Sequence, residues 1–506
     1  MKSLKCATFN DKFYVVKIES TFLRALPGFE IVGLADVTIK ESVSRVKASL
    51  LGLNFKFPAQ KIVINLSPSN LPKKGSHFDL AIALLIILQK ENFEEIFVFG
   101  ELGLDGQVKS TAELFSILLF LSTTNENKKI KVLVPKQIAQ KASMIPNLEI
   151  FAVSNLEEAF TFFIDENFAN SKKIEKTHPL FENPLKLQGK IFVKNENFEL
   201  DFSDVKGQKR AIRASLVAAA GMHNIMFEGS PGSGKSMCAK RIRYILPPLS
   251  LNEILKICAY QSLNCDENDF SALRPFRNPH HSSTRSSIFG GGTKSAKIGE
   301  VALANGGELF FDELPHFQKN ILESLREPLE DNKILVSRVN SKTEYETKFL
   351  FVATLNPCPC GKLFNKNSNC LCTQNEIKRY KSSISGPIMD RIDIYVAMDE
   401  INANDIPTTN SKELYQKVLI AFKAQIMRNQ SDFNGKLNDK DIKKFCILNQ
   451  ECKDILNFAI FRFNLSQRGI NKVLKVSRTI ADLAGHKDIQ KADLLESLSY
   501  KMRICE

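Results

Sequence analysis

The stretch Gly229-Ser-Pro-Gly-Ser-Gly-Lys235-Ser236 matches the pattern G-x-x-x-x-G-K-[ST] at every fixed position. An apolar, strand-like stretch at 224–227 precedes it, and a helix-like stretch at 237–245 follows it. A glycine-rich turn in that setting directs backbone N–H groups at a phosphate, and the start of the helix adds positive potential. This favours a P-loop for ATP over a chance glycine turn. The residues expected to line the phosphates are Gly229, Ser230, Pro231, Gly232, Ser233, Gly234, Lys235 and Ser236.

Two carboxylates downstream fit the same chemistry. The apolar stretch 308–311 ends in Asp312 and Glu313. Lys235 can reach the β- and γ-phosphates, while the Ser236 hydroxyl and Asp312 can hold Mg²⁺. Glu313 would orient and polarise the attacking water as a general base. The alternative is a strand that ends in a solvated acidic turn, and a complete P-loop upstream argues against it.

A third apolar stretch, 349–355, ends at Asn356, which could hold the attacking water or sense the γ-phosphate. Arg391 follows Ser385-Gly-Pro, and Arg468 and Arg478 lie in the C-terminal tail. An arginine supplied by a neighbouring subunit stabilises the transferring phosphoryl group and is typically worth ~10³–10⁵ in rate. Because surface arginines are common, spacing alone favours an ordinary role for all three.

The composition around these motifs is that of a globular protein. The chain has 506 residues, 43% hydrophobic and 25% charged, which excludes a disordered chain, a collagen-like fibre and a disulfide miniprotein. Residues 473, 476, 480 and 483 are apolar at helical spacing, and 14–18, 61–66 and 131–135 are strand-like. We therefore predict an α/β multidomain protein. Its expected parts are an N-terminal domain (1–170), a polar linker (171–200), an α/β core (201–400) and a helical C-terminal domain (401–506).

The charge is unevenly distributed. Lys and Arg outnumber Asp and Glu by 69 to 56, and residues 1–175, with 21 basic and 19 acidic residues, account for only +2 of the +13. The other +11 lies in 176–506, which fits a polyanionic partner or simply a basic proteome. The start of the chain lacks the features of a secretory signal, and the longest apolar run, 78–88, is too short to cross a bilayer. We expect a cytoplasmic protein with no membrane partner.

Four of the eleven cysteines lie close together in the sequence, as Cys358-Pro-Cys360 and Cys370-Leu-Cys372. Four thiolates at this spacing could close tetrahedrally around Zn²⁺. The alternative is reduced, metal-free thiols, because C-x-C is less usual than C-x-x-C at zinc sites. The adjacent His280 and His281 lack the spacing of a helical metal pair, so we expect them to be structural or to face DNA.

The motifs together resemble the YifB/ComM family of magnesium chelatase-like AAA+ ATPases, and the resemblance covers nearly the whole chain. The N-terminal stretches Leu26-Pro-Gly-Phe-Glu-Ile-Val-Gly-Leu and Asn65-Leu-Ser-Pro-Ser-Asn-Leu-Pro-Lys-Lys-Gly look like that family's Lon-protease-like domain. The ATPase module resembles it in Arg277-Asn-Pro-His-His, Asp312-Glu-Leu-Pro and Leu325-Arg-Glu-Pro-Leu-Glu-Asp. Ser385-Gly-Pro-Ile-Met-Asp-Arg resembles the family's arginine-finger segment. Arg468-Gly and Ser477-Arg-Thr-Ile-Ala-Asp-Leu resemble its lid.

This resemblance implies a Lon-protease-like α+β N-terminal domain, an AAA+ P-loop core and a helical lid. It also implies that Asn356 is the first sensor, that Arg391 is a finger acting in trans, and that Arg468, or alternatively Arg478, is the second sensor. The implied assembly is a hexameric ring, and the implied activity is ATP-driven branch migration of DNA in homologous recombination during natural transformation. Asn332 stands where the family usually has Gly, and Asn tolerates the positive φ of such a turn.

A ring motor grips DNA with basic loops, and two segments are candidates. The first, 274–297, contains Arg277, His280, His281, Arg285 and Lys294; the second, 333–348, contains Lys333, Arg338 and Lys342 around a predicted hairpin. Such side chains bind phosphates without reading bases. The alternative is that both are solvated loops.

Three other functions are alternatives to the DNA motor. One is a chelatase-type motor that drives metal insertion or remodels a protein partner, which the ATPase module fits equally well. Another is a scaffold with a vestigial ATPase, which the intact set of motif residues argues against. The last is proteolysis by a Ser–Lys dyad, for which Ser76 and Lys109 are candidates. We expect no proteolysis, because Ser76 lacks the glycine- and proline-rich surroundings of Lon-type nucleophiles.

Overall fold

The computed structural model describes residues 2–9, 13–124, 129–264, 270–291, 298–337, 342–365, 369–400 and 405–501. The chain divides into two compact units, Met1–Glu182 with Cys258–Phe270, and Asn183–Ile257 with Ser271–Glu506. Each unit is described by itself. None of the helices in the described ranges is both long and apolar enough to cross a membrane.

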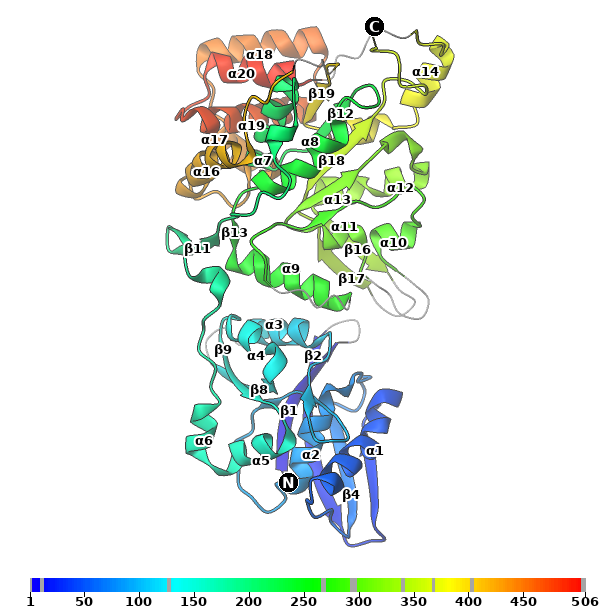
Figure 1. Cartoon of the computed structure of the whole chain (residues 1–506), viewed down its shortest axis with the longest axis vertical. Helices are drawn as coiled ribbons and strands as arrows, with labels where there is room; N and C mark the ends of the chain where they lie inside the picture. The colour runs from blue at the N-terminus through cyan, green and yellow to red at the C-terminus, as the bar shows by residue number, and fades with distance from the viewer. Residues whose placement is uncertain are drawn as a thin grey trace. The chain divides into compact units, whose positions relative to one another are not determined.

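The first unit is built on a seven-stranded mixed sheet in the order β3-β4-β2-β1-β5-β8-β9. β1 and β2 form a long antiparallel hairpin, and β5, β8 and β9 add in parallel (Figure 1). The three strand-like stretches predicted for this unit are confirmed. Its strands are β1 (Lys2–Phe9), β2 (Phe13–Leu23), β3 (Gly28–Val32), β4 (Lys61–Ser67), β5 (Phe97–Val98), β8 (Ile130–Pro135) and β9 (Leu148–Val153), with a small pair β6 (Glu101–Leu102) and β7 (Val108–Lys109).

In the first unit, the pattern of buried and exposed residues along each strand or helix shows which of its faces are covered. Ile62, Ile64 and Leu66 of β4 are buried while the residues between them are not, which is the period of two expected for a strand with one covered face. By contrast, every residue from Asp79 to Ile86 in α2 is buried, as in a helix enclosed on all sides. The helices are α1 (Val37–Gly52), α2 (Asp79–Ile87), α3 (Leu114–Thr124), α4 (Lys136–Ser143), α5 (Leu156–Ile164) and α6 (Glu166–Ser171).

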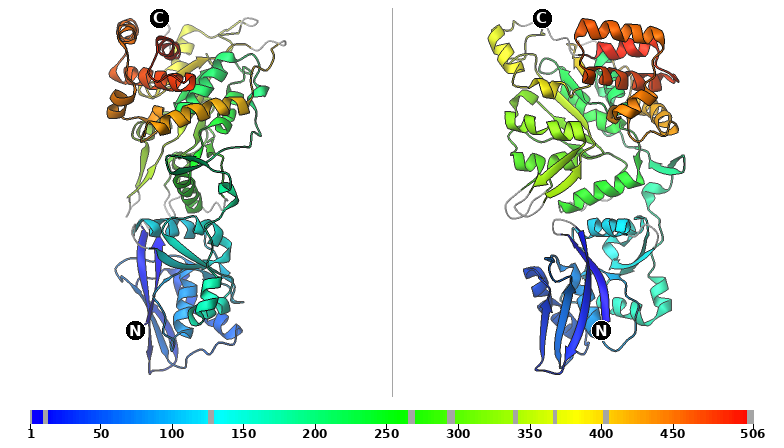
Figure 2. Two further views of the ribbon diagram at one scale, coloured as in Figure 1. Left: turned by 90° about the vertical axis from the view of Figure 1, so that its left-hand side faces the viewer. Right: turned by 180° about the vertical axis from the view of Figure 1, so that it is seen from behind.

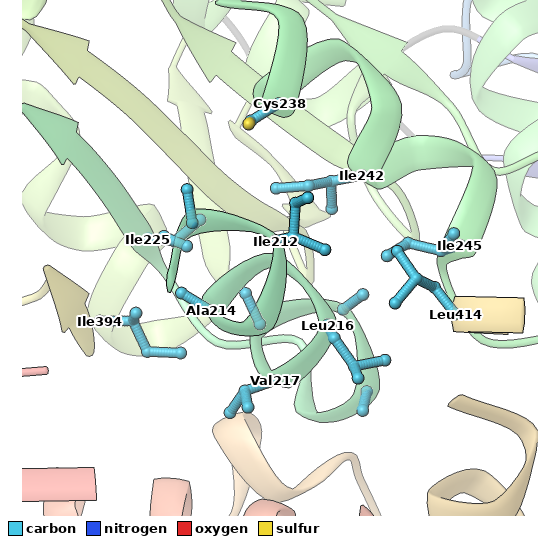
Figure 3. Packing of buried hydrophobic residues seen from close by; sticks show 14 of the residues in the cluster. Ile212, Ala214, Leu216, Val217, Ile225, Cys238, Ile242, Ile245, Ile394 and Leu414 are labelled. Carbon is cyan, nitrogen blue, oxygen red and sulfur yellow. The ribbon is translucent and has the colours of Figure 1, made fainter. Parts of the chain in front are cut away.

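The second unit contains a five-stranded parallel sheet in the order β14-β15-β18-β12-β19. β12, β15 and β18 are buried at every residue, as expected for parallel strands covered on both faces. Figure 3 shows Ile212 and Leu216 of α7 (Lys209–Gly221) in one apolar cluster with Ile225 of β12 and Ile242 of α8 (Lys235–Ile242). The strands are β14 (Phe276–Arg277), β15 (Glu308–Phe311), β18 (Leu350–Leu355), β12 (Ile225–Glu228) and β19 (Ile394–Ala397).

Helices α16–α20 form the C-terminal region and lie beside this sheet in both views of Figure 2. The helix predicted from apolar spacing is confirmed: α19 buries Val473, Val476 and Ile480, and Leu483 packs against the core cluster that contains Val476 and Ile480. The α/β multidomain class with a helical C-terminal region is therefore confirmed. The helices are α16 (Ser411–Met427), α17 (Asp439–Phe445), α18 (Gln450–Phe463), α19 (Gln467–Ala484) and α20 (Lys491–Ser499).

Several further elements lie outside the two main sheets. β16 and β17 form the predicted antiparallel hairpin. Asn332, which directly follows α13, has φ +52°, so the turn has the positive φ that asparagine was expected to tolerate. In the stretch expected to be a linker, β10 and β11 join β13 in a three-stranded sheet. These elements are β10 (Leu185–Leu187), β11 (Lys190–Val193), β13 (Leu249–Ser250), α9 (Leu251–Leu263), α10 (Arg285–Phe289), α11 (Glu300–Leu303), α12 (Lys319–Ser324), α13 (Arg326–Asp331), β16 (Lys333–Ser337), β17 (Lys342–Glu346), α14 (Gln374–Lys381) and α15 (Gly386–Met389).

Candidate nucleotide-binding site

The predicted nucleotide residues meet at the carboxyl edge of the parallel sheet. β12 pairs with β18, and β18 pairs with β15, so the three turns that follow these strands are neighbours. The P-loop follows β12, Asp312 follows β15, and Asn356 follows β18. Ligands of open α/β sheets bind at this edge, because the turns there converge and helix N-termini point at it.

The P-loop is folded tightly around the first turn of α8. The backbone N–H of Gly229 donates to the Leu355 carbonyl at 3.2 Å, which fixes the loop to β18. Gly232 and Gly234 have φ of +80° and +90°, a conformation that favours glycine. A side chain at Gly229 would lie only 2.6 Å from the Ser233 hydroxyl, so that position also needs glycine.

Lys235 is held at the centre of the site. Its ammonium group donates to the carbonyls of Gly229 (2.6 Å) and Ser230 (2.9 Å) and to Oδ1 of Asn356 (3.1 Å). Burial lowers its pKa, and the nearby carboxylates Asp312, Glu313 and Glu228 partly offset that effect. A buried cation whose hydrogen bonds go to neutral carbonyl and amide oxygens suits an incoming phosphate.

The expected magnesium ligands lie against each other. Oγ of Ser236 is 3.2 and 3.1 Å from the two carboxylate oxygens of Asp312. Mg²⁺ prefers such oxygen ligands, and it usually takes one or two carboxylates together with phosphate oxygens. In the described part of the chain, the buried hydroxyls of Ser230 and Ser233 have no hydrogen-bond partner, which is what a loop built for phosphate oxygens would leave. The residues therefore fit ATP with Mg²⁺.

Thr354 is a site residue that sequence reasoning missed. Its hydroxyl donates to Asp312 and accepts the backbone N–H of Glu313 at 3.0 Å. Glu313 itself has φ +53°, and its side chain is exposed at the edge of the site. The only sign of Thr354 in the sequence was a hydroxyl residue within the apolar run 349–355. Because threonine is common in β-strands, this sign does not distinguish a site residue from an ordinary strand residue.

Arg391 and Arg468, the residues predicted to be the arginine finger and the second sensor, lie together near the end of α13. Arg391 and Arg468 both form ion pairs with Glu330 at the end of α13. Arg391 is largely buried and also donates to the carbonyls of Pro387 (2.6 Å) and Arg326 (3.2 Å). The structure thus brings Lys235, Ser236, Asp312 and Asn356 together, and it places Arg391 and Arg468 around Glu330 instead.

Arg478, the alternative second sensor, is enclosed in the helical region. It is 1% exposed, and its guanidinium donates to Asp482 (3.1 Å) and to the carbonyls of Lys487 (2.9 Å) and His486 (2.7 Å). These partners lie in α19 and in the loop that follows it, and they occupy the guanidinium group of Arg478, whereas Arg468 is exposed.

The two segments expected to contact DNA are partly structural. Arg274, at the start of the first, is 1% exposed and binds the carbonyls of Pro247 and Pro248 together with Glu253. His280, His281 and Arg285 are exposed. Arg277 is half-buried, 3.8 Å from Glu300, and Lys333 is paired with Glu344 at 3.0 Å. Lys294 and Arg338 lie outside the described residues.

Ser76 in the first unit has a carboxylate partner. Its hydroxyl donates to Glu101, which lies opposite Lys109 in the β6–β7 pair. Lys109 is exposed.

The four clustered cysteines do come together. Their sulfur atoms all lie within 4.8 Å of one another. This cluster could hold a metal ion, and it lies between β18 and α14, next to the nucleotide residues in the sequence.

Comparisons with known proteins place the whole chain among related sequences. Three family models match: magnesium chelatase, subunit ChlI (residues 201–406); subunit ChlI of Mg-chelatase (18–138); and magnesium chelatase, subunit ChlI C-terminal (408–501). Competence protein ComM of Haemophilus influenzae is 34% identical over 502 residues, covering 97% of this chain and 95% of the relative. YifB of Escherichia coli, an uncharacterized protein, is 34% identical over 499 residues, covering 96% and 94%.

Proposed function

The chain belongs to the YifB/ComM family of magnesium chelatase-like AAA+ ATPases, and we propose that it is a ring-forming motor that couples ATP hydrolysis to branch migration of DNA. We further propose that it acts in homologous recombination during natural transformation, which the name of the Haemophilus influenzae relative, a competence protein, supports. The observation that carries the proposal is the meeting of Lys235, Ser236, Asp312 and Asn356 at one edge of the sheet.

In the proposed reaction, the P-loop amides and the Lys235 ammonium bind the β- and γ-phosphates, in place of the carbonyl and amide oxygens that Lys235 now contacts. Ser236 and Asp312 would hold Mg²⁺, which neutralises developing charge on the phosphate oxygens. The Glu313 carboxylate accepts a proton from the attacking water, and the Asn356 amide orients that water. Arg391, and with it Arg468, reaches the phosphate from a neighbouring subunit.

The proposed partner is branched or single-stranded DNA, bound without sequence preference by a homo-oligomer, in the proposal a hexamer. The exposed side chains of His280, His281 and Arg285 and the β16–β17 hairpin supply the contacts in this scheme. The charge of +11 on residues 176–506 supports a polyanionic partner. The proposed location is the cytoplasm.

A junction-unwinding assay tests the proposal. Purified chain is mixed with a labelled four-way DNA junction, with and without ATP, and strand exchange is followed by gel. We expect ATP-dependent migration, stimulation of hydrolysis by the junction, and binding that weakens steeply as salt rises. Lys235→Ala should bind no nucleotide, and Glu313→Gln should bind ATP but hardly hydrolyse it. If Glu313→Gln turns over like wild type, Glu313 is not the base.

A chelatase-type motor acting on a protein partner is the second candidate, because all three matching family models are named for a magnesium chelatase subunit. The same assay separates the two. ATP hydrolysis with no DNA binding even at low salt, and stimulation by a chelatase partner instead, would favour the second candidate.

A further inference from the structure

The cysteine cluster has the dimensions of a single-ion site. Sγ of Cys358 lies 3.4 Å from that of Cys360 and 3.6 Å from that of Cys370, and the Cys360–Cys370 separation is also 3.6 Å. Four sulfurs bound tetrahedrally at about 2.3 Å from one Zn²⁺ stand about 3.8 Å apart. Binding therefore requires movements of only a few tenths of an ångström for these three thiols.

The chemistry of the donors selects the ion. Four thiolates form a soft ligand set that suits Zn²⁺ and disfavours Mg²⁺, which takes oxygen ligands. The ion predicted here is thus distinct from the magnesium expected at Ser236 and Asp312. The segment also needs a crosslink, because Leu363, Phe364 and Leu371 are exposed and give it little apolar anchoring.

Both ends of the cysteine segment connect to the nucleotide site. The first cysteine pair begins two residues after Asn356, which contacts Lys235. The second pair ends directly before Thr373, which caps α14 with a full capping box. At the end of α14, Tyr380 lies beside the backbone of Asn356, and Lys381 is 3.1 Å from Glu228, the last residue of β12.

The segment also packs on the P-loop itself. Gly361 follows the first cysteine pair, and its backbone N–H donates to the Cys358 carbonyl at 3.0 Å. A Cβ at Gly361 would lie 2.5 Å from Cδ of Pro231, so the backbone there is in close contact with the P-loop. An ion at the cysteines would therefore hold three parts of the site: the Asn356 turn, the P-loop and α14.

We propose that Cys358, Cys360, Cys370 and Cys372 bind one Zn²⁺ that positions Asn356 and Pro231, so that ATP turnover depends on zinc occupancy. Cys358 is buried, Cys360 is exposed, and Cys370 and Cys372 are half-buried, so the site can be reached by an ion from solvent. The proposed dependence of ATP turnover on zinc rests on the proposed ATPase activity. The metal site itself does not rest on that activity.

The site is tested by metal content. The full chain and a variant with Cys370→Ser and Cys372→Ser are analysed for zinc, iron and copper by mass spectrometry, before and after incubation with Zn²⁺ alone. Leu371→Ser is the matched control, because it changes the same exposed loop and keeps all four thiols. We expect about one zinc per chain in wild type and control, and at least about tenfold less in the double variant. Wild type that takes up no zinc, or iron or copper in its place, would overturn the zinc site.

The coupling is tested by stripping zinc from wild type with a chelator and restoring it. We expect hydrolysis without DNA to fall about 10–100-fold and to return with Zn²⁺, and ATP affinity to change less, because the loss is one of alignment. Trypsin should also cut after Lys362 faster in the stripped protein. Unchanged turnover would refute the coupling, as would global unfolding seen by circular dichroism. If the wild-type protein has no ATPase activity at all, the proposed function is wrong. The measured zinc content would still show whether the four cysteines form a zinc site.

Discussion

At the scale of single residues, Thr354 connects two acidic residues that have different predicted roles, Asp312 and Glu313. Its hydroxyl donates to Asp312 and holds the backbone N–H of Glu313, whose positive φ is uncommon for a residue with a side chain. The hydroxyl is fully buried in β18, so it has no solvent alternative. We infer that Thr354 positions the proposed magnesium ligand Asp312 and the proposed base Glu313 together.

Replacing Thr354 with Val, which keeps the shape and removes the hydroxyl, is expected to lower kcat for ATP about 10–100-fold. The reason is that a hydrogen bond to a charged group is worth about 1.5–3 kcal/mol. Steady-state hydrolysis measures the effect, and Thr354→Ser should restore most of the rate. If Ser is as impaired as Val, the methyl group matters and the hydroxyl does not.

Glu308 makes the stability of the second unit depend on pH. It is fully buried at the start of β15, and burial raises its pKa well above the usual 4.5 despite the nearby Arg243. The unfolded chain loses this proton near pH 4.5, whereas the folded protein keeps it to a higher pH. Folding therefore takes up a proton between the two values, and the free energy of unfolding falls as pH rises through that window.

Glu308→Gln should remove this penalty, because the amide stays neutral at every pH. Relative to wild type, we expect the variant to gain stability between pH 5 and pH 8, by about 1.4 kcal/mol for each unit of the pKa shift inside that range. Thermal unfolding at the two pH values measures the gain. Glu327→Gln, which removes an exposed carboxylate, controls for the loss of one charge. An equal difference between variant and wild type at both pH values would contradict the prediction.

At the scale of elements, α13 collects two arginines that come from distant parts of the chain. Glu330 is 61 residues from Arg391 and 138 residues from Arg468. Without the carboxylate the two guanidinium groups would repel each other at close range. Glu330 thus keeps the pair at one point between α13, α15 and the start of α19.

We expect Glu330→Gln to lower ATP turnover roughly tenfold with little change in nucleotide affinity, because both arginines lose their alignment. Hydrolysis rates and equilibrium binding of a fluorescent ATP analogue separate the two effects. Glu327→Gln, on the same helix, should behave like wild type. A faster Glu330→Gln would show that the carboxylate restrains the arginines.

Signals within short stretches of sequence explain why the P-loop and the strands around it, in the second unit, could be predicted. The P-loop, its strand and its helix adjoin in the sequence, and the apolar strands 308–311 and 349–355 each end in a polar site residue. Contacts between distant segments could not be predicted in this way. Examples are the pairing of Glu330 with two arginines and the burial of Arg274. A third example is that Cys258–Phe270 belongs to the first unit. Each of these depends on which elements pack together, and the periodicity of a single segment does not encode that.

At the scale of the whole molecule, we propose that the active site is shared between subunits. The P-loop set is complete within one chain, whereas Arg391 is directed at Glu330. A head-to-tail interface would bring the arginines of one subunit to the phosphates of the next, and repeated interfaces of this type close into a ring. Hydrolysis by an isolated chain should therefore be slow.

Mixing two inactive variants tests the shared site. Arg391→Ala keeps an intact P-loop, and Lys235→Ala keeps an intact arginine. Each alone should be almost inactive, but in random equimolar rings about a quarter of the interfaces combine a working loop with a working arginine, so activity should return to about that fraction of wild type. ATPase rates after co-refolding or subunit exchange measure the recovery. Mixing Lys235→Ala with a chain carrying both substitutions should give none, since no interface then has a working loop. If co-assembled rings of the two single variants stay inactive, the arginine acts within its own chain.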